Sequence, residues 1–219
     1  MKKIYLFDIC GTLYNSNTTF DFLSYLLGEK KTYCLFDRFR SFWIWRGFNR
    51  LSRKILHKDI TRMLALRYLK GYTREELLHA ANAFYHEILI PKQNDSIIAN
   101  LKSFLLNPEN EVIIVSATID VIAEIISQHL LCKKWYSSQL LFENGVCKGK
   151  LESDLLGEKL YKVFGNFYPI FESVYTDDIS DLALLELAKN KNIIIYSKTV
   201  NRWKQIVRQK QWNVNFIEY

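Results

Sequence analysis

The sequence predicts an α/β protein: a Rossmann-like, doubly wound, mainly parallel sheet with an inserted helical cap. Two observations carry this prediction. In the second half of the chain, short apolar runs of strand length alternate with helical segments, which is typical of crossover units in a parallel sheet. A block with helical periodicity interrupts this pattern directly after the first strand. The length of 219 residues accommodates a core of about 140 residues plus such an inserted module.

The first element is a strand over residues 2–8, which is short, apolar and ended by a glycine turn. From about residue 17 to residue 89, apolar side chains recur at steps of three and four, so we expect three or four helices there. One of them begins after Thr73, because Glu76 follows three residues later as in a capping box. The predicted domains are a core formed by residues 1–16 and 92–219 and a helical cap formed by residues 17–91.

The remaining elements alternate between strands and helices. An Asn144-Gly145 pair between two strand-like runs predicts a tight hairpin turn. The expected strands are 111–116, 136–142, 146–151, 171–175, 192–196 and 214–217. The expected helices are 119–131, 157–164, 180–188 and 199–209. Crossovers of this kind predict helices on both faces of the sheet.

Cysteine usage and hydropathy indicate a cytoplasmic protein. The four cysteines are scattered and form no CxxC pair, so we expect reduced thiols rather than a disulfide framework. No apolar run reaches the roughly 18 to 20 residues of a membrane span, and the first apolar run is too short for a signal sequence. The sequence therefore favours a cytoplasmic protein that is at most attached peripherally to a membrane.

The net charge of +7 is concentrated in one segment. Residues 29–74 contain 13 Lys or Arg against three acids, a balance of +10 that leaves −3 for the rest of the chain. The same segment is rich in aromatic residues, among them Phe36, Phe39 and Trp43. They form either the core of the cap or a surface for an anionic substrate or an anionic membrane. No nucleic-acid motif accompanies the charge, so we expect no nucleic-acid partner. The sequence indicates no oligomeric state.

Polar side chains follow three of the predicted strands. Asp8 ends the first strand, Ser116 ends the second, and Asp177, Asp178 and Asp181 follow the strand 171–175. Lys159 opens the helix between the last two. Ligand sites of such sheets form beyond the carboxyl ends of the strands. Carboxylate oxygens suit Mg²⁺, while a lysine and a serine hydroxyl suit phosphate oxygens.

Four stretches with this spacing resemble the four motifs of the haloacid dehalogenase-like superfamily, in particular its phosphoserine-phosphatase-like branch. In chain order they are FDICGTL at 7–13, VSAT at 115–118, GEKL at 157–160 and YTDDISDLALL at 175–185. The resemblance covers essentially the whole chain, and its helical cap falls where this branch carries one. It implies a Mg²⁺-dependent phosphatase or phosphotransferase that acts on an anionic phosphorylated small molecule or lipid.

The resemblance also implies residue roles. Asp8 would be the nucleophile that forms an aspartyl phosphate. Asp8, the backbone carbonyl of Cys10 and Asp177 would hold Mg²⁺, and Asp178 or Asp181 would support the metal or orient Lys159. The residues expected to hold the substrate phosphate and its surroundings are Gly11, Thr12, Ser116, Ala117 and Lys159.

Three positions depart from the family pattern. Cys10 stands where the family has its second acid, the general acid and base for the leaving group. A thiol is a weak substitute, and the loss of a general acid typically costs about 10²- to 10⁴-fold in rate. Thr176 replaces a glycine, and Asn17 stands near the acid with which phosphoserine phosphatases hold the substrate amine, which argues against phosphoserine. Two alternatives follow: a catalytically degenerate protein that binds a phosphorylated ligand or partner, and a metal-independent dehalogenase, which the intact acids at 177, 178 and 181 disfavour.

Overall fold

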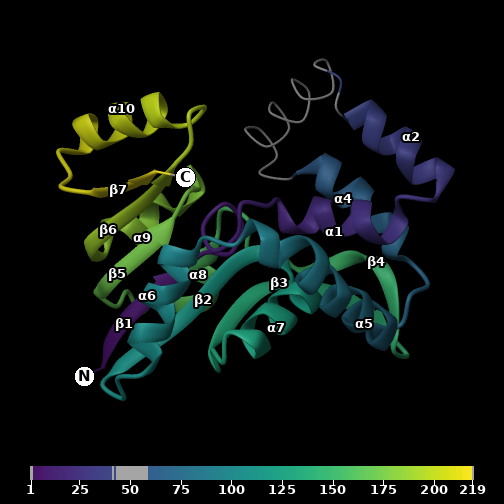
Figure 1. Ribbon diagram of the computed structural model, residues 1–219, viewed down its shortest axis with the longest axis horizontal. Helices are drawn as coiled ribbons and strands as arrows, with labels where there is room; N and C mark the ends of the chain where they lie inside the picture. Colours follow the sequence, from purple (N-terminus) through teal and green to yellow (C-terminus); the bar gives the residue numbers. More distant parts are fainter. Residues whose placement is uncertain (1, 41, 43–58, 219) are drawn as a thin grey trace.

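The structure is a computed structural model that describes residues 2–40, 42 and 59–218. Within these residues, one sheet of seven strands runs through the molecule in the order β4-β3-β2-β1-β5-β6-β7 (Figure 1). All neighbouring strands are parallel except the β3–β4 hairpin. The strands are β1 (Lys3–Phe7), β2 (Asn110–Ile119), β3 (Trp135–Glu143), β4 (Val146–Ser153), β5 (Phe171–Thr176), β6 (Ala188–Ile195) and β7 (Asn215–Glu218). The predicted mainly parallel sheet is confirmed.

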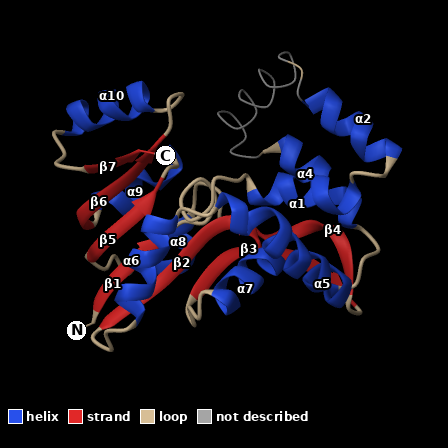
Figure 2. Cartoon of the chain, viewed as in Figure 1, coloured by secondary structure: helices blue, strands red, loops and turns tan. Residues whose placement is uncertain are grey.

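Helices cover both faces of this sheet (Figure 2). They are α1 (Thr18–Leu27), α2 (Lys31–Arg40), α4 (Ile60–Leu66), α5 (Arg74–Phe84), α6 (Asp95–Leu105), α7 (Asp120–His129), α8 (Lys159–Phe164), α9 (Leu182–Glu186) and α10 (Val200–Lys210). Side chains alternate between the faces of a strand. In β1, Phe7 therefore joins the cluster that contains α1, α5, α6 and α7, whereas Leu6 joins the cluster that contains α9 and α10. The central strand is buried on both faces, and the fold is doubly wound as predicted.

Two element predictions differ from the structure. Helix α6 was not predicted, although Asn94 caps it and its buried face, Ile97, Ile98 and Leu101, has helical spacing. Strand β6 begins at Ala188, inside the predicted helix 180–188, and not at residue 192. Its first residues carry lysine and asparagine side chains of low strand propensity, but they pair with β5 through backbone groups. Tertiary pairing overrides local propensity at the start of β6.

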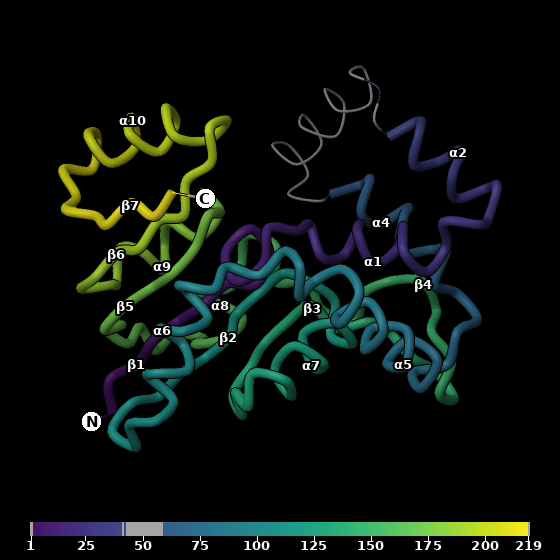
Figure 3. Tube along the Cα trace, viewed as in Figure 1, coloured from purple at the N-terminus to yellow at the C-terminus, as the bar shows by residue number. Residues whose placement is uncertain are grey.

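The β3–β4 hairpin turns at Asn144 and Gly145, both of which have positive φ as a two-residue type I′ turn requires. The hairpin also pairs with the inserted block. The Gly71 N–H donates to the Cys147 carbonyl at 3.0 Å, and the Cys147 N–H donates to the Tyr72 carbonyl at 2.8 Å. The trace in Figure 3 shows this hairpin extending from the sheet to the inserted helices. The insert and the sheet are thus joined by strand-like hydrogen bonds as well as by side chains.

The basic, aromatic part of the insert contains both buried and exposed rings. Phe36 packs against Tyr33 and Tyr68, so it belongs to the core of the insert. Phe39 and Phe42 are 53% and 57% exposed. The predicted aromatic position Trp43 lies outside the described residues, as do the basic residues between 43 and 58. None of the described helices is long and apolar enough to cross a bilayer. Binding to an anionic membrane surface stays a prediction.

Candidate active site

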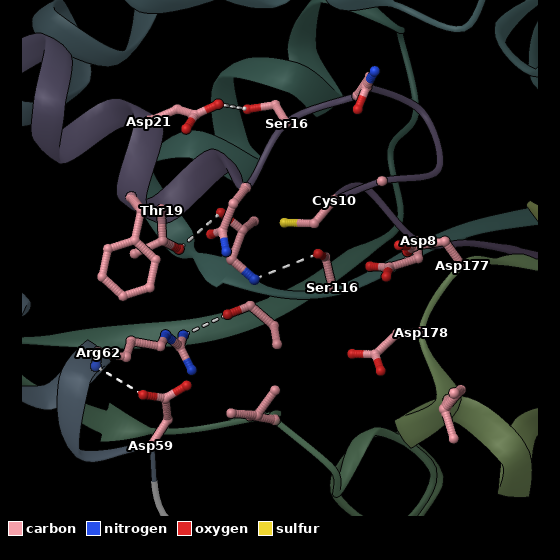
Figure 4. A pocket seen from close by; sticks show the side chains of 18 of the residues that line it. Asp8, Cys10, Ser16, Thr19, Asp21, Asp59, Arg62, Ser116, Asp177 and Asp178 are labelled. Carbon is pink, nitrogen blue, oxygen red and sulfur yellow. Dashed lines mark hydrogen bonds between the residues drawn. The ribbon is translucent and has the colours of Figure 1, made fainter. Parts of the chain in front are cut away.

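The predicted site residues meet at the carboxyl edge of the sheet. There all of them except the buried Thr12 and Asp181 line a cavity of about 590 Å³ between the sheet and the insert. Its lining includes Asp8, Cys10, Gly11, Ser116, Ala117, Lys159, Asp177 and Asp178. In Figure 4, Asp8 and Asp177 lie next to each other, with Ser116 and Asp178 close by. Four separate segments of the chain therefore contribute to one site.

Asp8 is held in place by two donors directly after β1. Its Oδ1 accepts from the Ile9 N–H at 2.8 Å and lies 3.1 Å from Lys159 Nζ. Its side chain is only 6% exposed. A buried carboxylate that is fixed by a backbone donor and a lysine has one orientation, and its second oxygen is left for the cavity.

Lys159, at the start of α8, forms ion pairs with two carboxylates. Besides Asp8, it contacts Asp181 Oδ2 at 2.7 Å. Burial alone would lower the pKa of Lys159, but the Asp181 and Asp8 carboxylates outweigh burial and raise this pKa above its usual value. Burial raises the pKa of Asp181 to about 6 in spite of the neighbouring Lys159 charge. In this geometry Asp181 orients the lysine and does not itself line the main cavity.

Thr176 has a structural role that the family's glycine could not supply. Its hydroxyl donates to Asp181 Oδ2 at 2.7 Å and accepts from the Asp178 N–H at 3.0 Å. The departure from the family pattern at this position thus adds one hydrogen bond that orients the acid behind Lys159.

Asp177 lies against the glycine turn that follows β1. Gly11 has φ +64°, and a Cβ at this position would lie 2.2 Å from Asp177 Oδ2, so only glycine fits. The Asp177 N–H donates to the Thr12 hydroxyl at 3.1 Å. Burial, together with the Asp8 and Asp178 charges, raises the pKa of Asp177 to about 8. Asp8 is therefore a buried acid and Asp177 a half-buried one, and a cation bound between them would offset their mutual repulsion.

The acids fit the expected Mg²⁺ site by their chemistry. Among the described residues, no three side chains of the Asp, Glu, His and Cys types are arranged to hold a metal. The expected site is sparser: the carboxylates of Asp8 and Asp177, the Cys10 carbonyl and water, with Asp178 in support. The raised pKa of Asp177, caused first by burial and then by the Asp8 and Asp178 charges, is the observation that favours a cation here, since bound Mg²⁺ would stabilise the ionised carboxylate.

Binding of Mg²⁺ near neutral pH is expected to release a proton. Because the Asp177 carboxyl has a pKa of about 8 without metal, it retains its proton at neutral pH, and the cation must displace that proton. The apparent Mg²⁺ affinity should therefore rise as the pH increases toward 8. Calorimetric titration in two buffers of different ionisation enthalpy measures the proton release directly. Asp177→Asn is the control and should lose both the affinity and the proton release; Mg²⁺ binding with no proton release would contradict the assignment.

Ser116 and Ala117 end the straight part of β2. Ser116 is fully buried, and its Oγ accepts weakly from the Thr118 N–H at 3.4 Å. The Ala117 carbonyl accepts from the Arg62 guanidinium and from the Ser138 hydroxyl. These contacts fix the backbone of the segment whose hydroxyl and N–H groups are expected to face the phosphate.

Arg62 is a cavity residue that the sequence did not single out. It comes from α4 of the insert, its side chain is 7% exposed, and it forms an ion pair with Asp154 at 2.7 Å. Burial would raise the pKa of Asp154, but the Arg62 charge and several hydrogen bonds lower this pKa below its usual value. The available signal was Asp59, a capping acid three residues before Arg62 that marks the start of the helix.

The C-terminal part of the chain also reaches the cavity. Tyr196, Thr199 and Arg202 line it, and the Tyr196 hydroxyl donates to the Gly11 carbonyl at 2.7 Å. Residues 187–217 contain seven Lys or Arg and no acid. The sequence contains this signal, but the summed charge of −3 outside residues 29–74 conceals it, because that sum also counts the acids elsewhere in the chain.

Cys10 faces away from Asp8. In Figure 4 its sulfur points toward the side of the cavity where Thr19 lies, and not toward Asp8. The sulfur lies 2.9 Å from the Thr18 hydroxyl. Burial and the Asp8 charge raise the pKa of the Cys10 thiol to about 11. The group that replaces the second acid is therefore a neutral thiol at physiological pH.

Comparisons with known proteins agree with this fold. The family model of the haloacid dehalogenase-like hydrolases matches residues 5–186. No curated protein matches the chain. A protein of unknown function from Bordetella pertussis Tohama I has a similar structure, with 16% identity, a TM-score of 0.74 and coverage of 98% of this chain and 99% of that one.

Two further structures are of named enzymes. The apo form of a phosphoserine phosphatase is similar at 17% identity and a TM-score of 0.59, over 99% of this chain and 94% of that one. A cytosolic 5'-nucleotidase bound to cytidine is similar at 11% identity and a TM-score of 0.62, over 99% and 80%. At such identities the likeness supports the fold, and the family model carries the assignment. The chain belongs to the haloacid dehalogenase-like hydrolases.

Proposed function

We propose that this hydrolase is a Mg²⁺-dependent phosphatase that works through an aspartyl phosphate at Asp8. The observation that carries the proposal is the position of the Asp8 carboxylate. One oxygen is fixed by the Ile9 N–H and Lys159, while the residue lines the cavity beside Ser116 and Asp177. A nucleophile, a phosphate cradle and a pair of acids for a cation are thus supplied together.

In the proposed reaction, the free oxygen of Asp8 forms a bond to phosphorus while the bond to the leaving-group oxygen breaks. The electron pair of that bond goes to the leaving oxygen. Lys159 and Ser116 offset the charge of the phosphoryl oxygens and keep them oriented. Mg²⁺, when bound, would neutralise further negative charge between Asp8 and the phosphoryl group. Water then attacks the phosphorus of the aspartyl phosphate, which releases phosphate and restores the Asp8 carboxylate.

The direct test is hydrolysis of 4-nitrophenyl phosphate with Mg²⁺ and with a chelator. An acid-quenched reaction analysed by mass spectrometry should show one phosphoryl group on the peptide that contains Asp8. Phosphate binding without turnover would favour the second candidate function, a degenerate phosphate-binding protein, for which the neutral Cys10 thiol is the specific observation. Metal-independent release of halide from a haloacid would instead favour dehalogenation.

The substrate is proposed to be an anionic phosphorylated molecule, because a cation lies at the rim of the cavity. This cation is Arg202 of α10, an exposed side chain that lines the cavity. It belongs to the core and not to the inserted helices. Arg62 is already paired with Asp154, which leaves Arg202 better placed to receive a second anionic group of the substrate.

Replacing Arg202 with glutamine is expected to weaken binding of substrates that carry a second anionic group. The Michaelis constant of a carboxylated aryl phosphate should rise about fivefold, the scale of one exposed ion pair, and the effect should fade at high salt. The unsubstituted aryl phosphate should be unaffected. Arg208→Gln, on the same helix but outside the cavity lining, is the matched control. Equal effects of both substitutions would reduce the role of Arg202 to general surface charge.

A further inference from the structure

Three hydroxyl and thiol groups form a hydrogen-bonded chain beside the nucleophile. The Cys10 sulfur lies 2.9 Å from the Thr18 hydroxyl, and the Thr18 hydroxyl donates to the Thr118 hydroxyl at 2.7 Å. Thr18 and Thr118 are 0% and 1% exposed. This chain of hydrogen bonds joins the loop after β1, the first residue of α1 and the end of β2. None of the roles proposed above for the cavity residues gives this chain of hydrogen bonds a function.

The direction of this chain is determined by proton counting. A threonine hydroxyl has a single proton, and that of Thr18 is donated to Thr118. Thr18 can therefore only accept from Cys10, so the thiol is the donor. Thr118 already accepts from Thr18, and its own proton must point elsewhere. Among the described residues, one further side-chain oxygen lies near the Thr118 hydroxyl. It is Thr19 Oγ1, at the long distance of 3.5 Å.

Thr118 belongs to the cavity in which the proposed substrate would bind. It lines the cavity, and it lies two residues after Ser116 near the end of β2. Its backbone N–H donates to the Ser116 hydroxyl at 3.4 Å, which places the two residues against each other. The chain of donors begins at Cys10, the position of the family's second acid, but the group that it presents to the cavity belongs to residue 118.

We propose that the Thr118 hydroxyl donates a hydrogen bond to the leaving-group oxygen of the substrate, and that Cys10 and Thr18 are positioning residues that keep this hydroxyl pointing outward. The inference rests on the proposed phosphatase function and names a further residue of that site. As the bond between phosphorus and the leaving oxygen breaks, the electron pair moves to this oxygen, and the Thr118 hydrogen bond stabilises the resulting anion. No proton is transferred from the chain.

A series of aryl phosphates with different leaving groups tests the proposal. Thr118→Val keeps the shape of the side chain and removes the donor, whereas Thr118→Ser keeps the donor. The valine variant should lose about tenfold in kcat for phenyl phosphate, the scale of one hydrogen bond, and less for 4-nitrophenyl phosphate, whose leaving oxygen carries less charge. A plot of log kcat/KM against leaving-group pKa should therefore become steeper. The serine variant should restore the wild-type slope. Damage to the fold would lower all rates alike and would leave the slope unchanged.

Calorimetric binding of inorganic phosphate separates this proposal from the proposed function. The fourth oxygen of phosphate can occupy the place of the leaving oxygen, so Thr118→Val should weaken its binding about tenfold and Thr118→Ser should not. If the wild type shows no turnover but this binding pattern appears, the donor assignment stands and the phosphatase function falls. If the valine variant binds phosphate like the wild type, or if Thr19→Val carries the loss instead, the assignment to Thr118 is overturned.

Discussion

With aspartate in place of Cys10, hydrolysis of an alkyl phosphate is expected to become faster by about 10²- to 10⁴-fold, the contribution of a general acid. An alkoxide is a poor leaving group and needs a proton, which the Cys10 thiol, with its pKa raised to about 11, does not readily give. An aryl leaving group departs without one, so aryl phosphates should gain only where hydrolysis of the aspartyl phosphate limits the rate. Turnover of one alkyl and one aryl phosphate, with Mg²⁺ present, is the measurement.

Cys10→Asn is the matched control, because asparagine has nearly the shape of aspartate and no acidic proton. It should give no gain on either substrate. Equal gains from aspartate on both substrates would show that dephosphorylation is the shared slow step. If the wild type is inactive and aspartate restores nothing, the enzyme function is excluded and a phosphate-binding role remains.

Asp8→Asn is expected to abolish turnover. The expected loss is about 10⁶-fold, which is the scale of the loss when the covalent nucleophile of a serine protease is removed. The carboxamide oxygen of the introduced asparagine can still accept from the Ile9 N–H, so the fold should persist. Without Mg²⁺ the variant should even unfold at a higher temperature. The substitution removes one of the charges that raise the pKa of Asp177, while Lys159 keeps its contact with Asp181.

Two measurements check this pair of expectations: turnover with Mg²⁺ and the thermal midpoint without it. Asp21→Asn is a suitable control, since Asp21 also lines the cavity but bonds to Ser16 and Lys92. It should keep activity within a few fold of the wild type. Substantial turnover by Asp8→Asn would rule out the aspartyl phosphate.

The strand-end residues of the site could be predicted because a short local sequence pattern marks each of them. Asp8 follows an apolar run and precedes a glycine, and Asp177 and Asp178 follow another such run. Parallel strands then bring these ends to one edge of the sheet without further information. The doubly wound topology followed from the same alternation of strands and helices.

Contacts between distant segments could not be predicted in this way. Thr18 reaches Thr118 across 100 residues, and Arg62 reaches the Ala117 carbonyl across 55. Neither residue type is unusual at its position in the sequence, so no local pattern marks it. Helix α6 differs, because its cap and its apolar spacing are present in the sequence. It lies between the insert and β2, before the regular alternation of strands and helices begins.

The central position of β1 has a consequence for how the protein is made. Strand β1 is synthesised before its two neighbours, β2 and β5, which pair with it through residues 110–114 and 173–175. At about 5–20 residues per second, the ribosome needs roughly 8–35 seconds between the first strand and its last partner. During that time the inserted helices can form, because their contacts are more local. The apolar side chains of β1 meanwhile lack the neighbouring strands that bury them. The Asp8 carboxylate, the proposed nucleophile, thus reaches its place late in biosynthesis, although its strand precedes both partner strands in the chain.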